Sequence, residues 1–228
     1  MTEPDVALTD YALALECAVF ACSLARAPST ASASPTGRSA GWLRMGSMAF
    51  FAFLALAAVC GGTLHGFYLD GSAPGHSIWW KSALLAMGAA VSAGWVVAAC
   101  LLVDGCGGRR VFGLAALAFV VYAGLVLGVV ADFRLALAGC LIITPALLAG
   151  FVRASRRPGS PPRIRLAVWG LVLSVVGAAL QQLQLGLHPR WFNHNAVYHA
   201  VEAVALALIF AGTRALLRPP GALHADAT

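Results

Sequence analysis

Charged residues are scarce in this chain, and their scarcity decides the class of protein. Only 11% of the 228 residues are Asp, Glu, Lys or Arg, against about 25% in a typical soluble domain. Hydrophobic residues make up 60% of the chain, and the mean hydropathy is +0.82. A soluble chain of this size could not hide so much apolar surface. The composition therefore excludes an ordinary soluble domain and indicates a membrane protein.

Motifs that would point to a familiar chemistry are also missing. The chain has no P-loop, no Gly-rich dinucleotide fingerprint and no HExxH zinc motif. Its six Cys contain no CxxC pair, so we interpret them as small packing residues. The net charge of +6 does not indicate a nucleic-acid partner, because the basic residues stand between apolar runs. The acidic start is unlike a secretory signal peptide, so we expect the first apolar run to be retained.

What the chain does contain is a series of charge-poor runs with the length needed to cross a bilayer core. These runs predict an all-α bundle of seven transmembrane helices, at residues 6–24, 45–68, 78–103, 111–130, 135–152, 166–187 and from about 191 to 217. We expect residues 1–218 to form one transmembrane domain and residues 219–228 to form a short polar tail. Membrane lipids are the expected surroundings.

The basic residues are distributed unevenly between the two ends of these runs. Three of the 15 Lys and Arg, namely Lys81, Arg134 and Arg190, fall at one end, and the other 12 fall at the opposite end. Basic residues collect on the cytoplasmic side of a membrane protein. The pattern predicts a multi-pass protein of a bacterial inner membrane, with its N-terminus outside and its C-terminus in the cytoplasm.

The last apolar run opens with a dense polar stretch, Trp191-Phe-Asn-His-Asn-Ala-Val-Tyr-His-Ala-Val-Glu202. Unpaired polar side chains are costly in lipid, so this stretch must face other protein or a water-filled cavity. On a helix Asn195, His199 and Glu202 share one face, and Tyr198 lies four residues before Glu202. We therefore predict a polar pocket at the outer end of the bundle.

Other polar residues fall at the same depth. Glu16, Gln181 and His199 each lie six residues, about 9 Å, inward of a reference residue near the mouth of their helix. For Glu16 that reference residue is Asp10, which we expect at the level of the lipid headgroups. With the predicted orientation, further candidates at the outer end are His65, Asp70, His76, His194 and Asn195.

Two hypotheses explain this polar layer. In the first, His65, His199 and one of His194 or Asn195 surround a zinc ion, with a fourth position open to water. Three protein ligands and one water are the usual arrangement of a catalytic zinc site. In the second hypothesis the same groups form a hydrogen-bonded network that holds the helices together.

Two segments carry a family resemblance. Residues 188–199, together with Gly61-Gly-Thr-Leu-His65-Gly, resemble an uncharacterised bacterial membrane-protein family. More distantly, the pattern is similar to the alkaline ceramidase superfamily, which includes the progestin and adiponectin receptors and the Per1-like proteins. Those proteins have seven spans, and three His bind zinc for the hydrolysis of lipid amides. The resemblance implies zinc ligation by His65 and His199, which match the second-span and the last His.

The chain departs from that superfamily at three places. Gly61 stands where the second-span Ser is expected, and Asn195 stands where the first His of His-x-x-x-His is expected, with His194 one residue earlier. The third-span Asp is replaced by His76 or displaced to Asp70. Zinc chemistry is therefore compatible with the resemblance but not required by it.

These observations favour a zinc-dependent lipid amidase or hydrolase, in which His65, His194 and His199 hold the metal, Glu16 or Glu202 handles the proton and an amphipathic small molecule is the substrate. The alternative is a non-enzymatic seven-helix receptor or sensor that binds a lipid or small ligand in the same pocket. A third reading is a structural partner of another membrane protein. A proton-coupled transporter is less favoured, because the inner halves of the runs hold few ionisable residues.

Overall fold

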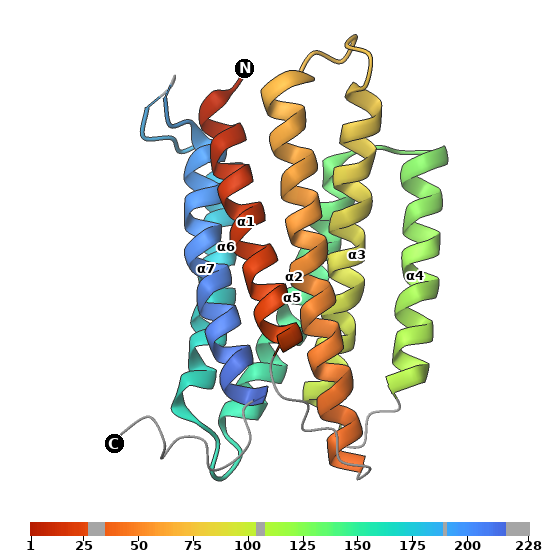
Figure 1. Ribbon diagram of the computed structural model, residues 1–228, viewed down its shortest axis with the longest axis vertical. Helices are drawn as coiled ribbons and strands as arrows, with labels where there is room; N and C mark the ends of the chain where they lie inside the picture. Colours follow the sequence, from red (N-terminus) through yellow and green to blue (C-terminus); the bar gives the residue numbers. More distant parts are fainter. Residues whose placement is uncertain (27–34, 104–107, 189–190, 218–228) are drawn as a thin grey trace.

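The protein is described by a computed structural model over residues 1–26, 35–103, 108–188 and 191–217 (Figure 1). The described residues form seven long helices and one short 3-10 turn, without a β-strand. The helices are α1 (Pro4–Arg26), α2 (Pro35–Phe67), α3 (His76–Leu102), α4 (Gly108–Gly128), α5 (Phe133–Ser155), α6 (Arg165–Gln182) and α7 (His194–Leu217), with η1 (Pro162–Ile164) before α6. Seven helical segments are long and apolar enough to cross a membrane. The prediction of an all-α seven-helix protein is confirmed.

Several helix bounds differ from those of the apolar runs that predicted them. The sixth run was expected to reach residue 187, whereas α6 ends at Gln182. The second run was expected from residue 45, whereas α2 begins at Pro35 and continues for 33 residues. The length of an apolar run shows which part of a helix can lie in the hydrocarbon core of a membrane. It does not show how many helical turns extend beyond that core. The predicted tail, residues 219–228, lies outside the described residues.

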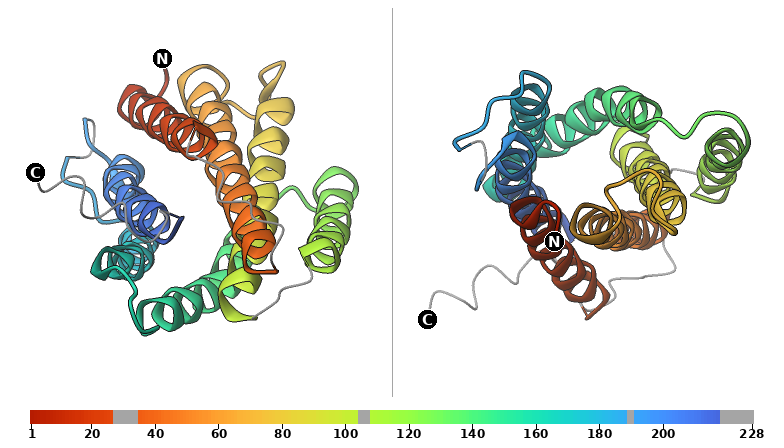
Figure 2. Two further views of the ribbon diagram at one scale, coloured as in Figure 1. Left: turned by 60° about the horizontal axis from the view of Figure 1, so that its bottom comes forward. Right: turned by 90° about the horizontal axis from the view of Figure 1, so that it is seen from above.

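Six of the helices form a closed ring. In the order α1, α2, α3, α5, α6 and α7, each helix packs against the next, and α7 packs back against α1. The view from above in Figure 2 shows this ring, with α4 standing outside it beside α3. There the Tyr122 hydroxyl of α4 donates a hydrogen bond to the Leu84 carbonyl of α3 at 2.9 Å. The ring brings the first and last helices of the chain side by side.

The two ends of the bundle differ in charge. We call upper end the end at which α1, α3, α5 and α7 begin, which is the top of Figure 1. Lys81 and Arg134 lie at the upper end, whereas the other ten Lys and Arg with described side chains lie at the lower end. The uneven distribution that the sequence suggested is therefore present along the axis of the folded bundle.

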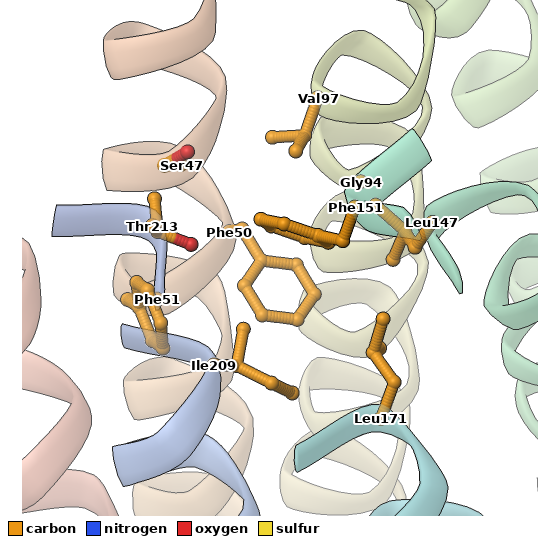
Figure 3. A pocket seen from close by; sticks show the side chains of 10 residues that line it. All are labelled: Ser47, Phe50, Phe51, Gly94, Val97, Leu147, Phe151, Leu171, Ile209 and Thr213. Carbon is orange, nitrogen blue, oxygen red and sulfur yellow. The ribbon is translucent and has the colours of Figure 1, made fainter. Parts of the chain in front are cut away.

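The lower half of the ring is a closely packed apolar core. The ring of Phe20 stacks on that of Phe210 with centroids 4.2 Å apart, and both meet the edge of Phe51. A cavity of only about 20 Å³ remains among side chains from five helices. Figure 3 shows the rings of Phe50 and Phe151 filling the space between these helices.

Glycine permits this close packing between α6 and α7. A Cβ atom added at Gly212 would lie 2.6 Å from both the Cβ and the backbone nitrogen of Ala167, and one added at Gly170 would lie 2.5 Å from the carbonyl oxygen of Ala205. Real Cβ atoms are not found at such distances from backbone atoms. The two helices therefore approach closely enough that only glycine fits at both positions.

Candidate functional site

The upper half of the ring encloses a cavity of about 360 Å³. This volume falls within the range of about 300–1,000 Å³ that is common for small-molecule sites. All six ring helices contribute lining residues, which are Asp10, Leu13, Leu54, Ala57, Ala58, Gly61, Leu64, His65, Trp80, Ala83, Leu84, Met87, Phe133, Gln181, Asn195, Tyr198, His199, Glu202 and Leu206. We call this space the ring cavity.

The lining of the ring cavity has two chemically different walls. Helices α1, α6 and α7 supply carboxyl, amide, phenol and imidazole groups, from Asp10, Gln181, Asn195, Tyr198, His199 and Glu202. Helices α2, α3 and α5 supply mainly aliphatic and aromatic groups, with His65 as the polar exception. The cavity therefore suits a molecule that has a polar part and an apolar part.

The best-connected polar group of the ring cavity is the imidazole of His199. Its Nδ1 lies 3.1 Å from the hydroxyl oxygen of Thr9, and its Nε2 lies 3.4 Å from Oδ1 of Asp10. Both side chains of the Asp10–His199 pair are nearly buried, with 11% of His199 and 7% of Asp10 exposed. These contacts join α7 to α1 on the inner side of the ring.

The donors and acceptors around His199 determine how many protons this group holds. The Thr9 hydroxyl lies 2.9 Å from the carbonyl oxygens of Asp5 and Val6, and it donates within its own helix. It can then accept a hydrogen bond from Nδ1–H of His199, and in this tautomer Nε2 of a neutral ring faces the Asp10 carboxyl group as an acceptor. Two facing acceptors need one proton between them. With this tautomer Asp10 and His199 share one proton, and the pair carries no net charge.

Two glycines on α2 make room for Asp10. A Cβ atom at Gly61 would lie 3.1 Å from Oδ2 of Asp10, and one at Gly62 would lie 3.0 Å from the Asp10 Cβ. We expected Asp10 at the level of the lipid headgroups. Instead it is a buried cavity residue, because α1 begins at Pro4 and turns the carboxyl group toward α2 and α7. The absence of side chains at Gly61 and Gly62 therefore leaves space for the Asp10 carboxyl group of α1.

Helices α6 and α7 share two further polar contacts along the ring cavity. Nε2 of Gln181 donates to Oδ1 of Asn195 at 3.1 Å, and the Ser174 hydroxyl donates to Oε1 of Glu202 at 3.1 Å. The second oxygen of Glu202, Oε2, is buried and has no hydrogen-bond partner among the described residues, and the same is true of Oε2 of Glu16. Buried carboxyl oxygens without a partner are costly, and each needs an explanation.

The N-terminal residues tie the upper ends of α2 and α7 together. Oε2 of Glu3 lies 2.6 Å from Nδ1 of His65, and the Glu3 backbone N–H donates to the His65 carbonyl at 3.2 Å. On the other side, Oδ2 of Asp5 accepts a hydrogen bond from the Asn193 backbone N–H at 3.1 Å. The residues that precede and begin α1 therefore form a short strap beside the ring cavity.

The folded chain brings together six of the ten site residues predicted from sequence. The residues that line the ring cavity are His65, Gln181, Asn195, Tyr198, His199 and Glu202. His65 of α2 and His199 of α7 both line the ring cavity, so side chains of the second and seventh helices reach one pocket. Their helices are not direct partners over most of their length, since α1 lies between them in the ring.

The other four predicted residues do not line the ring cavity. Glu16 lies on α1 with one buried carboxyl oxygen, and His194 is the first residue of α7. His76 begins α3 and its Nδ1 lies 2.7 Å from the Tyr68 carbonyl oxygen. Asp70 is exposed in the loop before α3, where the Ser72 backbone N–H and hydroxyl donate to its carboxylate and lower its pKa. Asp70 and His76 therefore organise a loop.

The described side chains of the predicted zinc ligands are engaged by other groups or lie apart from the ring cavity. Among the described residues no group of three or more His, Cys, Asp and Glu is placed so that it could hold a metal ion. The imidazole of His65 is held by Glu3, and both ring nitrogens of His199 face partners on α1. His194 lies outside the cavity lining. We therefore derive no chemical step through zinc.

Sequence reasoning missed Asp10, Thr9, Glu3 and Ser174 as members of the polar layer. A usable signal existed for Asp10, because the buried residues of α1 follow a helical repeat of three and four positions that includes it. They are Val6, Ala7, Asp10, Ala14, Cys17 and Leu24. An acid in phase with the buried face points inward and not to the headgroups. No comparable signal marks Glu3, which precedes the helix.

The fold and the site define a class of protein: a seven-helix protein of membrane-spanning composition with an amphipathic cavity inside a six-helix ring. Residues 6–218 match the model of a family of unknown function, DUF6962, and the chain belongs to that family. No curated protein and no solved structure matches the chain. The comparisons contain nothing that connects it to the alkaline ceramidase superfamily.

Proposed function

We propose that the protein is a multi-pass receptor or sensor of the bacterial inner membrane that binds a lipid or another amphipathic small molecule in the ring cavity. The orientation in this proposal has the upper end outside and the lower end in the cytoplasm. Seven helices of membrane-spanning length and hydropathy support insertion. The concentration of Lys and Arg at the lower end supports the orientation.

The two-walled lining of the ring cavity carries this proposal. A purely structural arrangement of side chains would fill its own space, as the apolar lower half of the ring does around a cavity of only about 20 Å³. The upper half instead surrounds about 360 Å³ with a polar wall on one side and an apolar wall on the other. A ligand that buries an alkyl chain against α2 and α3 while hydrogen-bonding to α6 and α7 would satisfy both walls.

Contact quenching of Trp80 tests binding directly. Trp80 lines the ring cavity, and its indole N–H donates to the Ala131 carbonyl at 2.7 Å, so the ring has a fixed position. We expect ω-bromoundecanol, added to purified protein in lipid nanodiscs, to quench Trp80 fluorescence in a saturable manner. The Trp80→Phe variant reports the non-saturable quenching of the other five tryptophans.

A matched pair of α2 variants separates cavity binding from partition into lipid. Ala57 lines the ring cavity, whereas Ala52 is exposed on the same helix. We expect Ala57→Phe to abolish saturable quenching and Ala52→Phe to preserve it. Equal quenching of both variants would place the probe in the surrounding lipid and would defeat the proposal.

A zinc-dependent lipid amidase or hydrolase is the second candidate. The observation in its favour is that His65 and His199 line one cavity next to Glu202. It has less support than ligand binding, because the described residues hold no three-ligand group. Its test is the metal content of the purified wild type beside His65→Ala and His199→Ala. Stoichiometric zinc that both substitutions remove would favour the hydrolase over the receptor.

A further inference from the structure

The identity of the polar group that the ring cavity recognises can be inferred from its charges, and this inference rests on the proposed binding function. Glu202 is the carboxyl group of the lining that has one oxygen without a hydrogen-bond partner among the described residues. Ser174 donates to one of its oxygens, and the other, Oε2, is buried without a partner among the described residues. A buried carboxylate is stable only if it is paired or hydrogen-bonded.

Several other polar groups of the lining already have a partner. Asp10 shares a proton with His199 and is neutral with it, as derived above from their contacts. Gln181 and Asn195 are hydrogen-bonded to each other. His65 is paired with Glu3. One carboxyl group of the cavity wall, that of Glu202, therefore still lacks a counterpart.

No basic side chain of the described chain supplies that counterpart. The cavity lining contains neither Lys nor Arg. On α7 the nearest Arg is Arg214, 12 residues below Glu202, which is about 18 Å along the helix. Lys81 follows the lining residue Trp80 but directs its ammonium group to the Leu127 carbonyl of α4, outside the ring. Glu16 adds a second carboxyl group close enough to interact electrostatically with Glu202.

The geometry points to a protonated primary amine on an apolar chain as the ligand of the ring cavity. Its ammonium group would donate to Oε2 of Glu202, and its remaining N–H groups would find acceptors among the amide and phenol oxygens of Asn195 and Tyr198. The cation also offsets the charge that Glu202 and Glu16 would otherwise bury together. The same wall disfavours fatty acids and other anionic amphiphiles, because they would meet carboxyl groups and neither Lys nor Arg.

The opposite wall suits the rest of such a molecule. Leu54, Leu64, Leu84 and Met87 provide aliphatic surface for an alkyl chain, and they come from α2 and α3. Burial of each methylene group of a ligand contributes about 0.8 kcal/mol of hydrophobic free energy. The alkyl chain of the ligand therefore supplies affinity, and its amine supplies selectivity. The cavity therefore separates the two parts of the ligand between its two walls.

A series of probes with one tail and three head groups tests the inference. ω-Bromoundecylamine, ω-bromoundecanol and ω-bromoundecanoate are titrated separately into wild-type protein in nanodiscs of zwitterionic lipid, and quenching of Trp80 is followed. We expect the amine to bind at least tenfold more tightly than the alcohol and the carboxylate to bind more weakly than both. Equal binding of amine and alcohol would overturn the inference and leave the proposed binding function intact.

The Glu202→Gln variant identifies the group that gives the selectivity. We expect it to reduce amine affinity to that of the alcohol while alcohol affinity stays unchanged. Asp70→Asn is the matched control, because it removes an acid from the same end of the bundle outside the cavity, and it should leave all three affinities unchanged. Loss of amine affinity in Asp70→Asn would reveal surface attraction instead. Absence of saturable quenching by every probe in the wild type would overturn both the inference and the proposed function.

Discussion

The upper and lower halves of the helix ring are built from the same six helices but fill their interiors in opposite ways. In the lower half, aromatic and aliphatic side chains leave about 20 Å³ unfilled, and in the upper half, polar and apolar walls stand around about 360 Å³. Close packing in the lower half holds the helices at fixed positions. The upper half can therefore keep an open cavity without losing the ring. The lower half therefore supplies the stability of the ring, and the upper half supplies the proposed binding site.

The largest effect should come from breaking the tightest contact of the lower half. Gly212→Leu places a side chain where even a Cβ atom would lie 2.6 Å from the backbone nitrogen of Ala167. Overpacking costs about 1–3 kcal/mol where side chains can shift, and it costs more here because two helix backbones would have to move apart. We expect little folded protein by size-exclusion chromatography in detergent. Gly124→Leu is the control, since a Cβ at Gly124 meets nothing within 4 Å. Similar yields of both variants would show that α6 and α7 are farther apart.

A cavity created in the lower half should cost less than this clash but still several kcal/mol. Phe51 is fully buried, with 0% of its surface exposed, whereas Phe53 on the same helix is 37% exposed. Removal of a buried Phe side chain typically costs about 3–5 kcal/mol. We expect Phe51→Ala to lower the denaturation midpoint far more than Phe53→Ala. If the two variants have equal midpoints, the lower half is not the stabilising core.

In the upper half, substitutions should change binding more than stability. Ser174→Ala removes the donor to Glu202 Oε1, and leaving a buried acceptor without a partner costs about 1–3 kcal/mol. Glu202→Gln removes the carboxyl group itself, so we expect its thermal stability to equal or exceed that of the wild type. Thermal unfolding of both purified variants shows whether each substitution lowers or raises the unfolding temperature. A strongly destabilised Glu202→Gln would mean that the carboxyl group serves packing and not a ligand.

Sequence reasoning predicted the helices and the polar layer better than the contacts within that layer. Apolar run length identified all seven helices, because lipid imposes a minimum length on a span. Depth counting placed Gln181 and His199 at one level, and both line the ring cavity. The depth of a residue along a helix does not show in which direction its side chain points around the helix axis. Glu16 satisfied the depth criterion and still lies outside the lining, whereas Asp10 points into it.

The metal hypothesis shows why residue type and depth do not determine a ligand set. His65 and His199 reach the same cavity, but each imidazole is engaged by an acid from the first ten residues of the chain. Those acids were assigned to the membrane surface or to the region before the helix. The strap of residues around Glu3 depends on contacts between positions 62 residues apart, which no local pattern specifies. Only the folded structure shows tertiary contacts of this kind.

The smallest predicted effect concerns the start of α7, which positions the polar wall. Oδ1 of Asn193 accepts hydrogen bonds from the backbone N–H groups of Asn195 and Ala196, at 2.9 and 3.1 Å, and so caps the helix. Loss of an Asn cap costs about 1 kcal/mol. We expect Asn193→Ala to lower the unfolding free energy by that amount and to increase amide hydrogen exchange in the first turn of α7. Asn193→Asp retains a capping oxygen and should restore protection. Unchanged exchange in Asn193→Ala would indicate that Asp5, which accepts a hydrogen bond from the Asn193 backbone N–H, holds this turn and not the side-chain cap.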